Sequence, residues 1–202
     1  RELKVRHEQL LETVITAPCE IMIADIKEED WANNWKQYFH PAKIGSRVVV
    51  KPSWENYIPG EDEIIIELDP CCAFGTGTHP TTSMCVGLME KYLTAGMKLF
   101  DVGTGSGILA VCAAKLGVGS IQAADYDNVA VRVARENIAK NGADNVIECF
   151  QSDLLKNFRG KADFISANII ADIIIRLFEE LPERLDKDGT LLASGIIEDR
   201  LK

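Results

Sequence analysis

The sequence lacks the features that mark several specialised classes of protein. It has no apolar run that approaches the length of a transmembrane helix, and residues 1–11 are too highly charged for a signal peptide. It also has no internal repeats and no low-complexity tracts. Its 202 residues, 47% hydrophobic and 26% charged, are typical of an ordinary globular protein with one sizeable domain and a small appendage. We therefore expect a cytoplasmic protein with no membrane partner.

Positive charge is also scarce. Lys and Arg number 22 against 31 Asp and Glu, which gives a formal net charge of −9, and no segment gathers the basic residues into a stripe. Tight sequence-independent binding to nucleic acid depends on neutralising phosphates, so we expect no direct nucleic-acid partner. An acidic protein remains compatible with a basic protein substrate.

The cysteines lack the spacing of a metal site. None of the six forms a C-x-x-C pair, and no group of histidines stands near them. We predict no metal and interpret the cysteines as reduced thiols, buried as small apolar residues. They are Cys19, Cys71, Cys72, Cys85, Cys112 and Cys149.

A glycine-rich turn, D-x-G-x-G-x-G over residues 101–107, follows an apolar run at 97–100. A dinucleotide fingerprint needs a small residue where this chain has Ile108, and Asp101 would repel an anionic pyrophosphate. A ligand with a sulfonium and an amino group, such as S-adenosylmethionine, suits an acidic loop better. The alternatives are a nicotinamide cofactor or a glycine turn without a ligand. We predict S-adenosylmethionine as the cofactor, bound by Asp101, Gly103, Gly105 and Gly107.

Two acidic residues end the next apolar segments. Asp125 stands where a ribose-binding acid is expected after such a glycine turn, and a carboxylate there accepts hydrogen bonds from both ribose hydroxyls. The alternative is a helix N-cap, for which Asp127 is better placed. Asp153 follows the apolar run at 146–150, where it would accept from the exocyclic amine of adenine. Its alternative is an ordinary loop residue.

A dense run of turn residues and hydroxyls covers residues 69–82. Thr82 falls in the first turn of the helix predicted next, and a helix N-terminus with hydroxyls holds a carboxylate such as that of methionine. Ordinary helix capping is the alternative. We interpret His79, which precedes a proline, as a turn residue and not as a base.

Asn168 stands at the predicted end of a strand, where ligands bind in open α/β sheets. Its amide both donates and accepts, so it can orient a nucleophilic amine toward a donor methyl group. The alternative is a cap for the helix that begins near residue 171.

Helical and strand patterns alternate from about residue 79. This alternation predicts a Rossmann-like α/β fold, a mostly parallel sheet with helices on both faces. Two strands, at 47–51 and 63–68, precede it. The predicted helices are 80–92, 107–116, 127–139 and 171–181, and the predicted strands are 98–102, 120–125, 146–150, 163–167 and 190–194.

The motifs at 31–36, 51–55, 73–82, 101–107, 167–169 and 194–196 resemble the PrmA family, the methyltransferases of ribosomal large-subunit protein eleven. The resemblance runs from about residue 20 to the end. It implies a class I methyltransferase fold, S-adenosylmethionine as the methyl donor, and methylation of the N-terminal amine and lysine side chains of that ribosomal protein. It further implies donor binding by Thr82, Gly103, Asp125 and Asn168, and a reaction centre formed by Asn168, Phe74, Gly75 and Thr76.

The resemblance also suggests a domain organisation. We expect residues 1–60 to be an N-terminal linker helix with the remnant of a substrate-recognition region. Residues 61–202 are then the methyltransferase domain, with its C-terminal strands truncated, and we expect it to act as a monomer. Methylation of RNA or of a small-molecule amine is an alternative function on the same fold. A donor-binding module without catalysis is another.

Overall fold

The computed structural model describes residues 39–69 and 79–196. All of these belong to one compact unit, 39–202. The expected domain boundary after residue 60 lies inside this unit, between two strands that pair with each other. Phe74, Gly75 and Thr76 lie outside the described residues. Among the helices that are described, none has the length and apolar character needed to cross a membrane.

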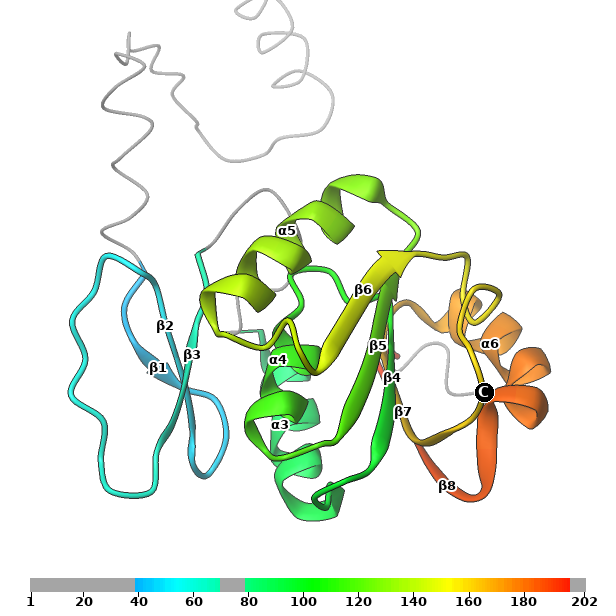
Figure 1. Cartoon of the computed structure of the whole chain (residues 1–202), viewed down its shortest axis with the longest axis horizontal. Helices are drawn as coiled ribbons and strands as arrows, with labels where there is room; N and C mark the ends of the chain where they lie inside the picture. Colours follow the sequence, from blue (N-terminus) through cyan, green and yellow to red (C-terminus); the bar gives the residue numbers. More distant parts are fainter. Residues whose placement is uncertain (1–38, 70–78, 197–202) are drawn as a thin grey trace, which may run out of the picture. The chain divides into compact units, whose positions relative to one another are not determined.

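The centre of the fold is a five-stranded sheet in which every neighbouring pair is parallel (Figure 1). Adjacent residues of its central strand point to opposite faces, since Leu99 packs in one hydrophobic cluster and Phe100 in another. Both faces are therefore covered. In spatial order the strands are β6 (Ile147–Gln151), β5 (Ser120–Asp125), β4 (Lys98–Val102), β7 (Ala162–Asn168) and β8 (Leu185–Ser194).

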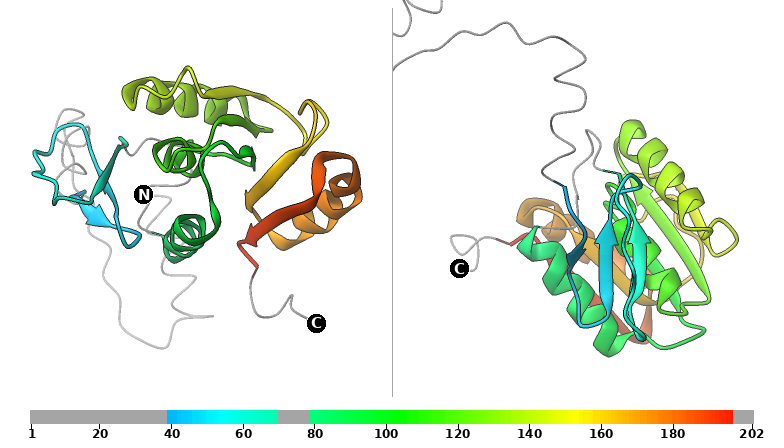
Figure 2. Two further views of the ribbon diagram at one scale, coloured as in Figure 1. Left: turned by 60° about the horizontal axis from the view of Figure 1, so that its bottom comes forward. Right: turned by 90° about the vertical axis from the view of Figure 1, so that its left-hand side faces the viewer.

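Helices lie on both sides of this sheet, as the alternating pattern predicts (Figure 2). On one face α3 (Pro80–Tyr92), α4 (Ile108–Lys115) and α5 (Asn128–Lys140) share the larger hydrophobic cluster. On the other face α6 (Ala171–Arg184) contributes Leu177 and Leu181 to the second cluster. The prediction of a Rossmann-like sheet with helices on both faces is confirmed.

A small three-stranded sheet packs against the helices of the larger cluster. In it β2 (Val48–Lys51) pairs antiparallel with β1 (Ala42–Lys43) and parallel with β3 (Ile64–Glu67). Glu90 of α3 joins this sheet through its carboxylate, which accepts hydrogen bonds from the backbone N–H groups of Ser46, Arg47 and Val48. These bonds fasten the loop before β2 to the side of α3.

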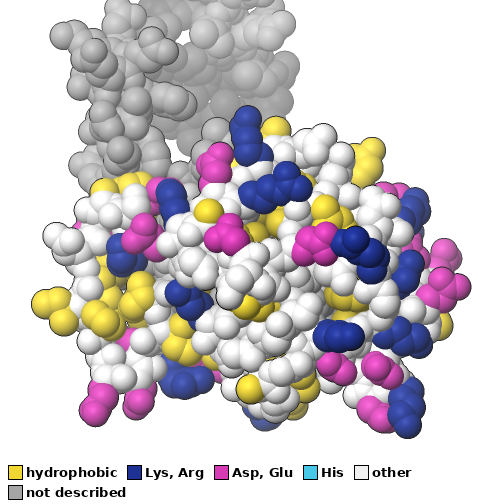
Figure 3. All heavy atoms as spheres, viewed as in Figure 1, with side chains coloured by type: hydrophobic (Ala, Val, Ile, Leu, Met, Phe, Trp, Pro, Cys, Tyr) yellow, Lys and Arg dark blue, Asp and Glu magenta, His cyan; other side chains and the backbone are white. Residues whose placement is uncertain are grey.

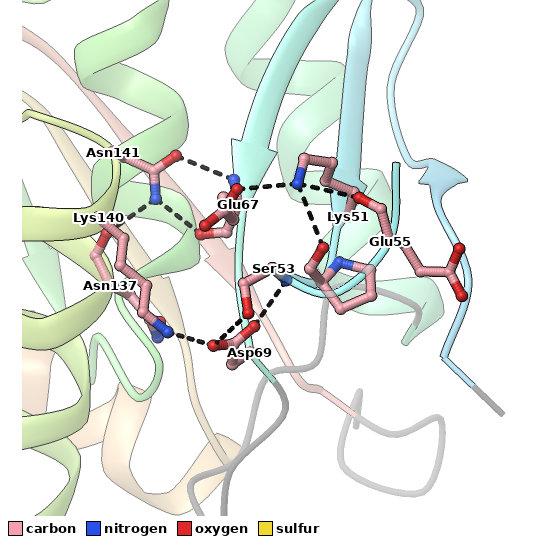
Figure 4. A network of polar contacts seen from close by, with 9 residues as sticks. Lys51, Ser53, Glu55, Glu67, Asp69, Asn137, Lys140 and Asn141 are labelled. Atoms are coloured by element: carbon pink, nitrogen blue, oxygen red, sulfur yellow. Dashed lines mark hydrogen bonds and ion pairs between the residues drawn. The ribbon is translucent and has the colours of Figure 1, made fainter. Parts of the chain in front are cut away.

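The C-terminal end of α5 joins the small sheet through polar side chains (Figure 4). The amide of Asn141 donates to the carbonyl of Glu67 at 2.7 Å and accepts from the N–H of Glu67 at 2.9 Å. Next to it the Asp69 carboxylate accepts from the N–H and hydroxyl of Ser53 and pairs with Lys140. These bonds therefore join the small sheet to the C-terminal end of α5.

The last strand begins earlier than the sequence predicts, at Leu185 instead of residue 190. Residues 186–189 are polar with a glycine, so no strand pattern precedes Thr190 in the sequence. These four residues have no partner on β7, since the paired positions pass from Leu185 opposite Ala162 to Thr190 opposite Phe164. Continuous pairing with β7 therefore begins at Thr190, where the sequence predicts the strand, and residues 186–189 form an irregularity before it.

Charges of both signs are mixed over the surface. Lys and Arg side chains lie among Asp and Glu side chains on the described part of the face in Figure 3. Lys43–Glu63 and Lys51–Glu67 are examples of ion pairs between such side chains in and beside the small sheet.

Candidate functional site

A cavity of about 860 Å³ lies at the carboxyl edge of the main sheet. The chain leaves the central strand β4 toward β5 and β6 on one side and later adds β7 and β8 on the other, so this edge is a topological switch point. Residues that follow each of the five strands line the cavity. They are Gly103, Tyr126, Ser152, Ile169 and Gly195.

The glycine-rich turn forms part of the wall of this cavity. Gly103 and Gly105 line it, and both have positive φ, 73° and 56°. A Cβ atom on Gly103 would stand 2.3 Å from Cγ2 of Ile169, so no larger residue fits there without a shift. The N–H groups of Gly103 and Thr104 donate to the carbonyl of Ala124 at 2.9 Å, which joins the turn to β5.

Asp101 and Gly107, predicted to bind the cofactor, do not line the cavity. The Asp101 carboxylate is 1% exposed and accepts hydrogen bonds from the hydroxyls of Thr104 at 2.6 Å and Ser166 at 2.7 Å. Burial raises the pKa of this carboxyl above its ordinary value, while the two hydroxyls oppose the shift. Asp101 therefore links the glycine-rich turn to β7 through these two hydrogen bonds.

Gly107 is the N-cap of α4, with φ 82°, and a Cβ atom there would stand 3.2 Å from the Cβ of Ala134. Its lack of a side chain lets α4 and α5 approach each other closely. Gly107 thus shapes the fold behind the cavity and forms no part of its wall.

Asp125, at the end of β5, lines the cavity. Its carboxylate accepts from the N–H of Gly105 at 3.0 Å and from the N–H of Asp127 at 2.9 Å. Asp127 is the N-cap of α5, since its side chain accepts from the N–H of Val129. The alternative of Asp125 as the cap is therefore wrong, and its carboxylate faces the turn and the cavity.

The N-terminus of α3 borders the same cavity. Thr82, in the first turn of the helix, is 2% exposed and lines the wall beside His79 and Thr81. His79 is the N-cap, with Nδ1 accepting from the N–H of Thr81 and lying 2.7 Å from its hydroxyl oxygen. The positive end of a helix dipole is thereby presented to the cavity.

Asn168 is the last residue of β7 and also lines the cavity. It pairs in register with Ser194 of β8, and the N–H of Ile169 donates to the Ser194 carbonyl at 3.1 Å. The N-cap of α6 is Ile170, without a side-chain bond, so the alternative of Asn168 as the cap is wrong. The end of a buried strand therefore places Asn168 at the cavity.

Asp153 lines the cavity beyond the end of β6. Its carboxylate pairs with Lys156 and with Arg176 of α6. Hydrogen bonding from Lys156, with smaller effects from its charge and from Arg176, lowers the pKa of Asp153 below its ordinary value. This carboxylate is therefore an ionised acceptor at neutral pH.

The structure thus brings six of the predicted residues to one cavity, and their binding roles stay predictions. The six are Thr82, Gly103, Gly105, Asp125, Asp153 and Asn168. Sequence reasoning missed Arg176, Tyr126 and Ile169, which also line it. Tyr126 and Ile169 directly follow Asp125 and Asn168, so their positions in the sequence could have indicated that they line the cavity. Arg176 reaches the site only because α6 crosses the face of the sheet.

Comparison with known proteins identifies a family. The family model described as "Ribosomal protein L11 methyltransferase (PrmA)" matches residues 2–202. The ribosomal protein L11 methyltransferase of Caldanaerobacter subterraneus subsp. tengcongensis is 56% identical over 182 residues, which are 90% of this chain and 59% of that protein. The protein of the same name from Thermoanaerobacter sp. (strain X514) is 54% identical over 183 residues, 91% of this chain and 59% of that protein. The chain spans about 59% of the length of these curated relatives.

Solved structures give the same result. The ribosomal protein L11 methylase of Lactobacillus delbrueckii subsp. bulgaricus superposes with a TM-score of 0.71 at 38% identity, over 78% of this chain and 81% of that one. The precorrin-6y C5,15-methyltransferase of Geobacter metallireducens GS-15 superposes with a TM-score of 0.53 at 16% identity, over 61% of this chain and 66% of that one. The second likeness supports the fold alone.

Proposed function

Because the chain belongs to the ribosomal protein L11 methyltransferase (PrmA) family, we propose that it transfers methyl groups from S-adenosylmethionine to amino groups of ribosomal protein L11. The observation that carries the proposal is the convergence of six predicted residues, from five separate segments, on one cavity at the carboxyl edge of the sheet. The proposed acceptors are the N-terminal amine and lysine side chains.

The cavity suits the proposed donor in size and in chemistry. Its volume of about 860 Å³ falls in the range of about 300–1,000 Å³ common for small-molecule sites. Its wall combines apolar side chains, such as Ile108 and Leu109, with polar ones, such as Thr82 and Asp125. S-adenosylmethionine supplies a methyl group bonded to a positively charged sulfur.

Each polar group of the wall matches one part of that donor. We assign the N-terminus of α3, with Thr82, to the carboxylate, because a helix N-terminus favours negative charge. The backbone of Gly103 and Gly105 lies along the methionine portion, Asp125 accepts from the ribose hydroxyls, and Asp153 accepts from the adenine amine. All of these residues line the same cavity.

Asn168 acts on the acceptor amine. The residue stands at the end of β7, and its amide supplies both a donor and an acceptor with which to orient the amine. A lysine amine has an ordinary pKa of about 10.4 and must lose its proton before it attacks. We assign that proton to solvent water.

We place this reaction in the cytoplasm, with the chain acting as a monomer. The thiols of Cys85, Cys112 and Cys149 are buried and free. Burial raises the pKa of Cys112 to about 12 and that of Cys149 to about 11, which keeps both thiols unreactive. Unpaired, inert thiols fit a reducing compartment.

The test is a methylation assay on purified ribosomal protein L11, with intact-mass and peptide mass spectrometry as the readout. The proposal predicts methyl increments on amino groups that require both the chain and S-adenosylmethionine. Parallel reactions on ribosomal RNA fragments and on small amines examine the alternative substrates. Methyl transfer to either, with none to L11, would contradict the proposal. Donor binding without any transfer would favour a binding module.

A further inference from the structure

Two side chains of α6, one helical turn apart, hold the turn that follows β6. Arg176 and Glu180 stand four residues apart, which places them on the same side of the helix. The Glu180 carboxylate accepts from the N–H of Leu155 at 2.9 Å. The Arg176 guanidinium lies 3.3 Å and 3.4 Å from the two carboxylate oxygens of Asp153. Helix α6 therefore contacts this turn at Asp153 and at Leu155, the residues on either side of Leu154.

The turn itself has a specific backbone geometry. Leu154 has φ 53°, and among the described residues it is the one non-glycine with positive φ. The buried hydroxyl of Ser152 donates to the Leu154 carbonyl at 2.8 Å and accepts from the N–H of Asn157 at 3.1 Å. These bonds fix the backbone on both sides of Asp153, so only its side-chain torsions remain to be set.

Two cations face Asp153 from different directions. Arg176 lines the cavity, while Lys156 belongs to the turn and does not line it. Lys156 makes the larger contribution to lowering the pKa of Asp153. The Nη2 atom of Arg176 contacts both oxygens from the cavity side, and Lys156 bonds to Oδ2 from within the turn. The two cations therefore hold the carboxylate from two directions, and the one on the cavity side contacts both of its oxygens.

Orientation matters for the choice of base. A 6-amino purine presents a donor at position 6, whereas a 6-oxo purine presents an acceptor there and a donor at N1. A carboxylate that rotates freely can accept from either base by turning toward the available donor. A carboxylate held in one direction accepts from one of them and faces a lone pair of the other, which is unfavourable.

We infer that Arg176 is a positioning residue, which aims the Asp153 carboxylate at position 6 of the purine and so makes the cavity select adenosyl over inosyl ligands. The inference rests on the proposed function, because it takes the nucleoside of the donor as the occupant of the cavity. It adds a determinant of base selectivity on α6, outside the glycine turn and the strand ends.

The test is isothermal titration of the full chain with S-adenosylhomocysteine and with S-inosylhomocysteine. The wild-type chain should prefer the adenosyl ligand by about tenfold or more. Arg176→Met should reduce that ratio by about fivefold or more, mainly because the inosyl ligand binds better. Arg176→Lys should restore part of the ratio. Lys156→Met is the matched control, since it removes the other cation on Asp153, and should keep the wild-type ratio.

Several results would overturn the inference. One is a ratio of adenosyl to inosyl affinity in Arg176→Met that equals the wild-type ratio. Another is an equal loss of affinity for both ligands in that variant, which would indicate that Arg176 contacts the ligand directly instead of positioning Asp153. A third is a ratio that falls as far in Lys156→Met as in Arg176→Met, which would make charge the determinant. Thermal unfolding of each variant confirms that it folds. Failure of the wild-type chain to bind either ligand would refute the proposed function itself, and the inference with it.

Discussion

The Cγ2 atom of Ile169 occupies the place beside Gly103 where a side chain would otherwise stand, only 2.3 Å from the position of a Cβ atom on that glycine. The carbonyl oxygen of Ile169 lies equally close, at 2.3 Å, to the Cβ position of Gly195. Ile169, the residue that follows β7, therefore packs closely against the residues that follow β4 and β8. Asn168 directly precedes it, so this packing fixes the proposed amine-orienting group relative to the glycine turn.

Replacing Gly103 by alanine should damage both stability and binding. The residue has φ 73°, and its new Cβ atom would collide with Ile169. We expect a loss of more than about 3 kcal/mol in the free energy of unfolding, from backbone strain together with the clash. We also expect at least about tenfold weaker binding of S-adenosylhomocysteine. Chemical denaturation and calorimetry measure the two effects.

Gly142→Ala is the matched control for this substitution. Gly142 also has positive φ, 63°, but nothing lies within 4 Å of its Cβ position. It should lose only about 1–2 kcal/mol and keep the wild-type affinity for the ligand. Equal losses of stability and of ligand affinity in Gly103→Ala and Gly142→Ala would show that the contact with Ile169 makes no contribution.

Asn168→Ala should separate catalysis from donor binding. The amide is proposed to orient the acceptor amine, so its removal should lower turnover of ribosomal protein L11 by about 100-fold or more. Affinity for S-adenosylhomocysteine should change by less than about fivefold. Turnover that survives the substitution on a proven substrate would refute the role given to Asn168.

Glu90 should make the stability of the protein sensitive to acid. Although burial opposes the shift, hydrogen bonds from Ser46, Arg47 and Val48 lower the pKa of Glu90 in the folded state. Its stabilisation is therefore complete above the ordinary carboxyl pKa and is lost as the pH falls through the lowered value. Glu90→Gln should cost about 1–2 kcal/mol at pH 7, and the difference from wild type should shrink below about pH 4.

Urea denaturation at a series of pH values measures this dependence. Glu136→Gln, at an exposed position of α5, serves as the control and should follow the wild-type curve throughout. A difference between Glu90→Gln and wild type that stays constant from pH 7 to pH 3 would contradict the prediction.

Asn141→Ala should loosen the small sheet without affecting the cavity. The Asn141 amide makes two hydrogen bonds with the backbone of Glu67 and one with the carbonyl of Asn137. Their loss should cost about 2–3 kcal/mol in the free energy of unfolding, while ligand affinity stays as in wild type. Asn128→Ala, at an exposed position of the same helix, should change stability by less than about 0.5 kcal/mol. A large drop in ligand affinity in Asn141→Ala would show that the small sheet shapes the donor site.

Local patterns were sufficient to predict most of the main sheet. The strands at 98–102 and 120–125 and the helix at 80–92 have the predicted bounds, because apolar periodicity, caps and glycines agree there. The early start of β8 was not predictable, since it depends on one pairing of Leu185 with Ala162, which an unpaired polar stretch separates from the rest of the strand.

The candidate site was predictable where residues follow strand ends, because parallel strands bring such residues together. Asp125 and Asn168 are examples. The burial of Asp101 was not predictable, since its two hydroxyl partners come from the turn and from a strand 65 residues away. Arg176 was missed for a similar reason, because its place depends on how α6 packs across the sheet.

The most direct test of the central claim is isothermal titration of this chain with S-adenosylmethionine, with NADH as the control ligand. We expect saturable binding of S-adenosylmethionine at micromolar concentrations and no binding of NADH, because the cavity offers carboxylates and a glycine turn unsuited to a pyrophosphate. Binding of NADH in preference to S-adenosylmethionine would contradict the assignment of the cavity as a methyl-donor site.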